Sequence, residues 1–172
     1  MSVGRHLAAA LLAFGFVCAA FCADAQELVA TEPAAKDFRL GAFEISVLRD
    51  GGLSVPNDGS IFAQNAKPSD VTKVLADAGA PTDRILLDID ALLIRMPDHL
   101  VLIDAGYGPA VHGVLRDSLK LAGAAPDDVT DILITHAHPD HVGGLVDSAM
   151  APVFRKAIVR MSDKEWTFMK SE

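Results

Sequence analysis

The chain has 172 residues, of which 51% are hydrophobic and 22% charged, and its formal net charge at pH 7 is −8. This length is sufficient for one domain with a buried core. The acidic balance argues against nucleic acid and anionic membrane surfaces as partners, because both carry negative charge. A small-molecule substrate is the partner we expect, and nothing in the sequence indicates an oligomeric state.

The first 25 residues are predicted to be a secretory signal peptide. Arg5 precedes an apolar run over residues 7–17, and Ala23-Asp24-Ala25 offers a small-x-small cleavage site before Gln26. A membrane anchor is the alternative reading, but the run is short for a spanning helix and polar residues follow it at once. We therefore expect an exported protein, periplasmic or secreted, without a stable membrane anchor.

Both cysteines, Cys18 and Cys22, lie inside this predicted signal peptide. The mature chain would then have no disulfide, no thiol nucleophile and no thiolate ligand. Removing residues 1–25 takes away one base, Arg5, and one acid, Asp24, so the net charge stays at −8. Any metal ion must be held by His and carboxylate side chains alone.

From residue 26 onward the pattern predicts a mixed α/β domain. Residues 26–37 lack periodicity and are predicted to be a mobile leader, and residues 38–49 alternate as one or two edge strands that end at Asp50-Gly51-Gly52. Further strands are predicted at 85–95, 100–104, 132–134 and 156–161, and helices at 69–78, 111–121 and 142–149, with a last helix after the capping box of Ser162 and Glu165. His99 and His112 are expected to be solvated.

The most informative stretch follows the short apolar run of residues 132–134. His136, His138, Asp140 and His141 place four potential metal ligands within six residues. In an extended chain, residues two apart point to the same side, so His136 and His138 can converge on one ion.

Pro139 biases His138 away from helical dihedrals, which protects this extended geometry. Asp140 and His141 then reach a second ion where the chain turns into a helix. Gly143 and Gly144 leave room for backbone to pass close to the metal pocket. The donor set of imidazoles and a carboxylate suits zinc, and also iron, manganese or cobalt. The alternative is that Asp140 only caps a helix and that the histidines form a solvated loop.

A second polar position follows the predicted strand at 100–104. Asp104 ends this strand and is followed by Ala105 and Gly106. A carboxylate there can accept a hydrogen bond from a metal-binding histidine and so orient it. The alternative is an Asp that only starts a turn.

The segment Thr135–Gly144 resembles the H-x-H-x-D-H signature of the metallo-β-lactamase superfamily. The resemblance implies that His136 and His138 hold one metal ion, Asp140 and His141 a second, and that Asp140 also acts in catalysis by orienting the water or protonating the leaving group. Asp104-Ala105-Gly106 resembles the family's Asp-Thr-Gly motif, with Ala105 in place of Thr.

The same resemblance implies a fold and an activity. The expected fold is the αβ/βα sandwich, of which residues 38–172 would form only the first half. The expected activity is that of exported methyl-parathion-hydrolase-like or lactonase-like members, in which a hydroxide shared by two divalent ions, most often zinc, attacks an ester, lactone or phosphotriester. The alternatives are an iron-dependent oxidoreductase on the same fold and an inactive, truncated remnant.

Three ligands that the family supplies later in its chain are not found in this sequence. These are a third ligand for the first metal, a bridging Asp and a last His, and no histidine follows His141. Either the sequence is a truncated form or a partner chain supplies the remaining ligands. If it is truncated, one apolar face of the sheet lacks its opposing layer.

Overall fold

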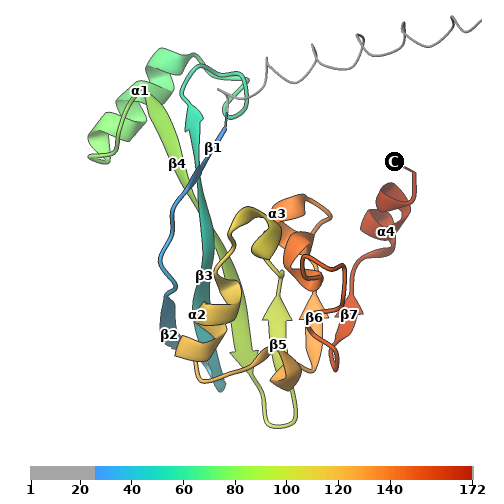
Figure 1. The fold of residues 1–172 in the computed structure, drawn as a ribbon. Helices are drawn as coiled ribbons and strands as arrows, with labels where there is room; N and C mark the ends of the chain where they lie inside the picture. Colours follow the sequence, from blue (N-terminus) through green and yellow to red (C-terminus); the bar gives the residue numbers. More distant parts are fainter. Residues whose placement is uncertain (1–25, 172) are drawn as a thin grey trace, which may run out of the picture.

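The computed structural model describes residues 26–171, so the expected signal peptide over residues 1–25 lies outside the described part. One sheet of seven strands organises this part, in the order β1-β3-β4-β5-β6-β7 with β2 also paired to β3 (Figure 1). The strands are β1 (Glu27–Val29), β2 (Ala35–Leu40), β3 (Phe43–Pro56), β4 (Arg84–Arg95), β5 (Leu100–Ile103), β6 (Asp131–Leu133) and β7 (Ile158–Arg160). The helices are α1 (Pro68–Asp77), α2 (Leu115–Leu121), α3 (Pro139–Val142) and α4 (Asp163–Met169), with 3₁₀ turns η1 (Pro109–Val111), η2 (Pro126–Asp128) and η3 (Gly143–Leu145). The expected α/β architecture is confirmed.

The two long strands β3 and β4 pair antiparallel over their whole length. Their ends reach beyond the shorter strands and carry α1 away from the rest of the sheet (Figure 1). The prediction that the strand ends at Asp50-Gly51-Gly52 was wrong, because β3 continues through a bulge between Arg49 and Gly51. A bulge accommodates one extra residue without ending a strand.

Residues 26–37, which were expected to be a mobile leader, form part of the sheet. It contains β1 and the first residues of β2, and both pair antiparallel with β3. Backbone hydrogen bonds to the long strand β3 hold both strands in place. The polar and small side chains of the segment give no sign of this pairing.

The predicted helix over residues 142–149 is also not formed as a single helix. The short α3 leads into η3, and Val146 then pairs with Pro152. Gly143 and Gly144 are poor helix formers, and a Cβ at Gly144 would overlap the carbonyl oxygen of Ala105. The two glycines are therefore used for close packing.

The core lies between one face of the sheet and α2. Leu93, Leu102 and Ile132 stand in register on adjacent strands and are fully buried. Leu115 and Leu119 of α2 belong to the same buried cluster. Complete burial of each such leucine contributes about 1.5–3 kcal/mol, so the sheet and α2 stabilise each other.

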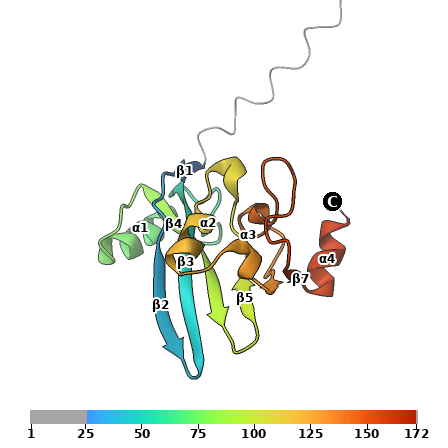
Figure 2. The ribbon, with the colours of Figure 1, turned by 60° about the horizontal axis from the view of Figure 1, so that its bottom comes forward.

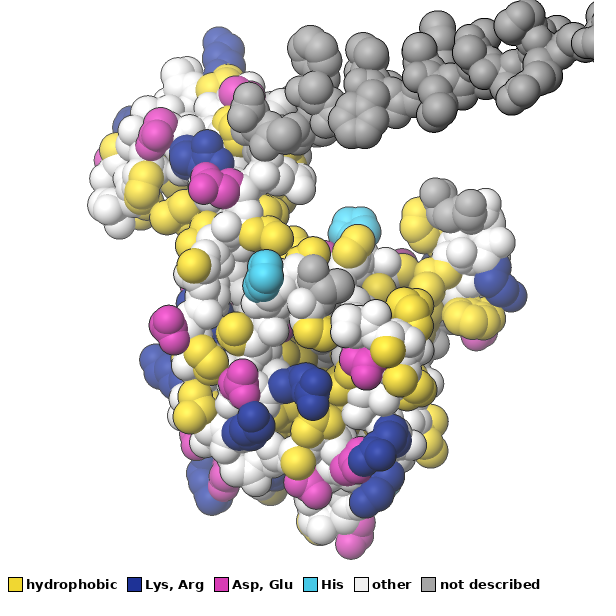
Figure 3. Space-filling view, viewed as in Figure 1, with side chains coloured by type: hydrophobic (Ala, Val, Ile, Leu, Met, Phe, Trp, Pro, Cys, Tyr) yellow, Lys and Arg dark blue, Asp and Glu magenta, His cyan; other side chains and the backbone are white. Residues whose placement is uncertain are grey.

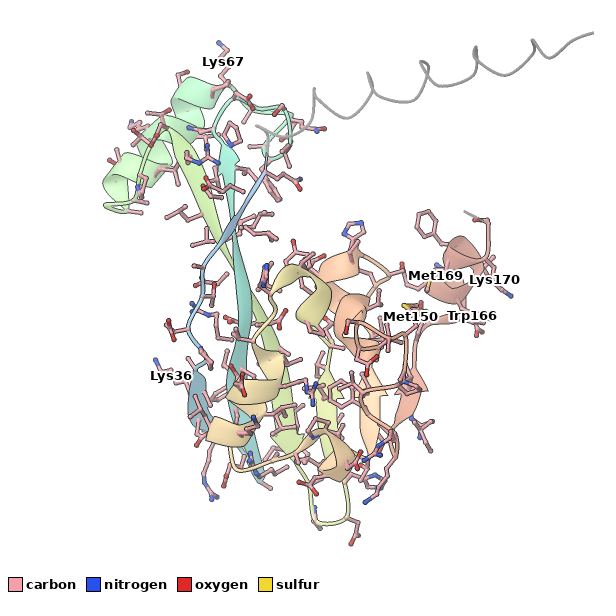
Figure 4. All side chains as sticks on the ribbon, viewed as in Figure 1. Lys36, Lys67, Met150, Trp166, Met169 and Lys170 are labelled. Carbon is pink, nitrogen blue, oxygen red and sulfur yellow. The ribbon has the colours of Figure 1, made fainter. Side chains whose placement is uncertain are left out.

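The opposite face of the same strands is apolar but less covered. Leu92, Ile103 and Leu133 form the adjacent register row, and Leu133 is 39% exposed. Hydrophobic side chains are also exposed towards the C-terminal edge, where Figure 4 places Trp166 and Met169 on α4, and over the region of α1 (Figure 3). Within residues 26–171, no helix has the length and apolar character needed to cross a membrane.

The β4–β5 turn lies at the end of the sheet opposite α3 (Figure 2). A polar cluster lies at this end of the sheet. Asp131 contacts Nδ1 of His99 at 2.8 Å, the hydroxyl of Thr130 at 2.9 Å and the guanidinium of Arg160 at 2.9 Å. The His99 side chain is 56% exposed, as expected, and it also forms a hydrogen bond to Asp131. The bonds from His99, Thr130 and Arg160 lower the pKa of Asp131 to about 2.

We predict that this cluster makes stability depend on pH in the acid range. Because the folded-state pKa lies below the ordinary value of 3.8, the stabilisation is present above about pH 4 and is lost as the pH falls towards about 2. Asp131→Asn should lower the thermal midpoint at pH 7 and flatten its fall between about pH 4 and pH 2. Circular dichroism melts against pH measure this, with Asp98→Asn in the exposed turn as control. Parallel profiles for wild type and Asp131→Asn would contradict the prediction.

Candidate metal centre

The candidate site lies where the parallel strands β5 and β6 end. Ile103 and Leu133 are the last residues of these strands and stand opposite each other in the register. Asp104 follows β5, and Thr135 and the four candidate ligands follow β6 and run into α3 (Figure 1). Parallel pairing brings both carboxyl ends to one edge, so residues 30 positions apart along the chain meet there.

The carboxylate of Asp104 is the centre of the hydrogen bonds at this edge. It accepts the backbone N–H of Thr135 at 2.8 Å and the Thr135 hydroxyl at 2.7 Å. Its Oδ2 lies 2.7 Å from Nδ1 of His141. Asp104 is only 7% exposed and has a φ of +62°, a left-handed conformation that Asp tolerates better than most residues.

These bonds determine which nitrogen of two histidines is free. A carboxylate only accepts, so Nδ1 of His141 donates to Asp104, and Nε2 is the ring nitrogen that faces Asp140, at 3.3 Å from Oδ2. The Thr135 hydroxyl proton also points to Asp104, so the Thr135 oxygen accepts from Nδ1 of His136, which lies 3.0 Å away. Nε2 of His136 therefore carries no proton and accepts from Nδ1 of His138, 3.1 Å away. Asp104 and Thr135 together fix Nδ1 of both rings in hydrogen bonds, so that Nε2 is the nitrogen turned towards the other candidate ligands.

The four candidate ligands are brought together as two pairs. His136 Nε2 lies 3.1 Å from His138 Nδ1, and Asp140 Oδ2 lies 3.3 Å from His141 Nε2. Two ligand atoms about 2.0–2.1 Å from one tetrahedral ion are about 3.4 Å apart. Both pairs thus have the spacing of neighbouring ligands on a single ion. The ring centroids of His136 and His141, one from each pair, are 3.9 Å apart.

The donor set fits divalent metal ions, with two protein ligands for each ion. Among residues 26–171, no group of three or more His, Cys, Asp or Glu side chains is arranged to hold one ion. Zinc in proteins usually has four ligands, so other groups must complete each coordination sphere. That His136, His138, Asp140 and His141 bind metal stays a prediction.

Close backbone packing fixes the segment that follows the ligands. Ala105 donates its N–H to the carbonyl of His141 at 2.8 Å, and Gly144 donates to the carbonyl of Gly106 at 3.0 Å. A Cβ at Gly143 would overlap the Tyr107 carbonyl oxygen. The glycines were expected to leave space for another backbone segment, and the backbone of residues 105–107 occupies that space.

Two contributors to the site were not identified from the sequence. No separate role was predicted for Thr135, although a hydroxyl directly before a histidine cluster is a recognisable signal. Glu165 was expected to complete a capping box with Ser162. The Ser162 hydroxyl does accept the N–H of Glu165 at 3.2 Å, but the Glu165 carboxylate accepts the N–H of Ala137, between His136 and His138, at 3.1 Å.

Comparison with known proteins agrees with this geometry. The family model described as "Metallo-beta-lactamase superfamily" matches residues 84–168, which include both strand ends and all four candidate ligands. The chain belongs to the metallo-β-lactamase superfamily. The resemblance expected from the sequence is confirmed at this level, and so is the fold.

Two solved structures of this superfamily resemble the chain over most of its length. One is AidC, a dizinc quorum-quenching lactonase in complex with a product, with 33% identity and a TM-score of 0.74 over 79% of this chain and 47% of that one. The other is the hydrolase AbOPH, with 27% identity and a TM-score of 0.69 over 81% of this chain and 48% of that one. The chain thus spans about half the length of these structures.

A curated relative matches over a shorter segment. Metallo-beta-lactamase domain-containing protein 1 from Mus musculus is 47% identical over 45 residues, which are 26% of this chain and 17% of the mouse protein. The match supports the superfamily assignment. Because it covers so little of either protein, it gives no information about the substrate of this chain.

We predict that Asp104→Asn weakens zinc binding by about 10- to 100-fold, the usual effect of removing a group that orients a metal ligand. The amide of Asn would turn donor hydrogens towards partners that already donate. Zinc affinity is measured by competition with a chromophoric chelator. Asp131→Asn is the matched control, because Asp131 is equally buried and also contacts a histidine ring, at the other end of the sheet. Equal zinc affinity of Asp104→Asn and wild type would contradict the role of Asp104.

Proposed function

We propose that this chain belongs to a hydrolase that uses two divalent ions, zinc in the first instance, to cleave an ester, a lactone or a phosphotriester. The observation that carries the proposal is the arrangement of four ligands in two pairs, each with the spacing of neighbours on one ion. Bound there, divalent ions lower the pKa of a water molecule towards neutrality and polarise the oxygen of the scissile group.

The side chains of the chain itself have separate roles in this proposal. Nε2 of His136 and Nδ1 of His138 hold one ion, and Nε2 of His141 with Oδ2 of Asp140 hold the other. Asp104 and Thr135 keep His136 and His141 in the tautomers that leave Nε2 free. The ligands are therefore preorganised, which reduces the reorganisation needed when ions and substrate bind.

Asp140 is the residue to which we assign proton transfer. One of its carboxylate oxygens is directed to His141, which leaves the other free to accept a proton from the attacking water. The water oxygen then bonds to the carbonyl carbon or phosphorus, the bond to the leaving oxygen breaks, and Asp140 returns the proton to that oxygen. The carboxylate is regenerated at the end of the cycle.

A lactone or a related ester is the substrate class that we favour. The support is the similarity to AidC, which is a lactonase, at 33% identity. Since a signal peptide is expected at residues 1–25, we further propose that the reaction takes place outside the cytoplasm.

The experiment is hydrolysis of N-hexanoyl-homoserine lactone, an aryl ester and an aryl phosphotriester by the full chain reconstituted with zinc. We predict hydrolysis that a chelator abolishes and zinc restores. His136→Ala and Asp140→Ala should each lower kcat/KM by about 100-fold or more, because each removes a metal ligand. His99→Ala, a histidine at the far end of the sheet, is the control and should retain activity.

Two results would contradict the proposal. The first is hydrolysis at the wild-type rate by His136→Ala or Asp140→Ala while circular dichroism shows a folded chain. The second is a preparation that binds iron, consumes oxygen with substrate and hydrolyses none of the three test compounds.

A further inference from the structure

A buried carboxylate outside the candidate ligand set lies beneath the loop that follows β5. Asp50 is 0% exposed. Its side chain accepts the N–H of Tyr107 at 2.6 Å and of Leu115 at 2.9 Å, and its carbonyl oxygen accepts the N–H of Val114 at 2.8 Å. These bonds hold both ends of the loop formed by residues 105–114.

The β3 bulge explains why this side chain faces the loop. Arg49 pairs with Asp90 and Gly51 pairs with Ile89, which leaves Asp50 without a partner on β4. A bulge of this kind redirects a side chain and occurs often next to functional sites. Asp50 is thus free to bind the loop and not the neighbouring strand.

Two glycines allow the loop to approach the carboxylate closely. A Cβ at Gly113 would lie 2.6 Å from Oδ1 of Asp50, and a Cβ at Gly106 would overlap Oδ2. Burial raises the pKa of Asp50, and the hydrogen bonds from Tyr107, Leu115 and Val114 oppose this rise. Within the described residues, no ion pair to Asp50 compensates its burial. Backbone N–H groups of the loop therefore provide its main stabilisation.

The same loop contacts the segment that carries the candidate ligands. Ala105 and Gly106 exchange hydrogen bonds with His141 and Gly144, at 2.8 and 3.0 Å. A Cβ at Gly108 would lie 2.7 Å from the carbonyl oxygen of Gly143. A continuous set of short contacts thus leads from Asp50 through residues 105–108 to residues 141–144.

We propose that Asp50 is a positioning residue for the metal centre: by holding the loop of residues 105–114, it fixes the backbone of His141 and of the glycines that follow it. This inference rests on the proposed metal-binding function, because the position of the His141 backbone affects metal binding only if His141 is a ligand. The hydrogen bonds of the Asp50 side chain go to Tyr107 and Leu115 and not to the side chain of any candidate ligand.

The test compares Asp50→Asn with Asp131→Asn, another buried carboxylate with several hydrogen bonds, in the full chain. We expect Asp50→Asn to weaken zinc affinity by about tenfold or more and to shift the visible absorption bands of the cobalt-loaded chain. Asp131→Asn should leave zinc affinity within about twofold and the cobalt spectrum unchanged, even if both variants lower the thermal midpoint. Wild-type zinc affinity and cobalt spectrum in folded Asp50→Asn would overturn the inference.

Hydrogen exchange separates this inference from the proposed function. In the metal-free chain, Asp50→Asn should exchange the amides of Ala105 and Gly144 at least about tenfold faster than wild type, because these bonds join the loop to the ligand segment. If wild type binds no zinc, the proposed function fails, and the exchange rates alone decide whether Asp50 holds the loop. Unchanged exchange at both amides would overturn that role.

A pair of glycine variants covers the case in which Asp50→Asn does not fold. Gly113→Ala places a methyl group against Asp50 and Gly108, whereas the methyl group of Gly51→Ala meets only ordinary contact, 3.5 Å from Cδ2 of Tyr107. Gly113→Ala should weaken zinc binding by about tenfold and Gly51→Ala should not. Equal zinc affinities for the two variants would count against the inference.

Discussion

The carboxylate of Asp104 is the contact on which the geometry of the candidate site depends. It accepts hydrogen bonds from the backbone and hydroxyl of Thr135 and from the ring of His141. Through Thr135 it also acts on His136, since the threonine hydroxyl can donate only once. One buried acid therefore fixes the ends of two strands relative to each other and orients one imidazole in each candidate ligand pair.

The sheet makes this contact possible, and the loop after β5 stabilises it. Parallel pairing of β5 and β6 brings residues 104 and 135 to one edge. The loop then crosses the bulge in β3, where Asp50 binds it, before α2 packs on the buried face of the sheet. Two buried carboxylates thus have related tasks: Asp104 orients side chains, and Asp50 holds the backbone beside them.

The sequence predicted those parts of the molecule that local pattern determines. The strands at 85–95 and 100–104 were predicted, because apolar runs mark them clearly. The four candidate ligands and Asp104 were identified from spacing. Three features could not be predicted, because each depends on contacts between distant segments. They are the pairing of β1 and β2 with β3, the bulge at Asp50 and the hydrogen bond from Ala137 to Glu165. The helix predicted over residues 142–149 failed because Gly143 and Gly144 pack against the loop after β5.

We propose that the two candidate ligand pairs at the ends of β5 and β6 bind two divalent ions. Anomalous diffraction at the zinc absorption edge, from crystals of the full chain grown with zinc, tests this most directly. We expect one anomalous peak bonded to Nε2 of His136 and Nδ1 of His138, and a second bonded to Asp140 and to Nε2 of His141. Crystals in which these four side chains are ordered, point into solvent and have no anomalous peak beside them would contradict it.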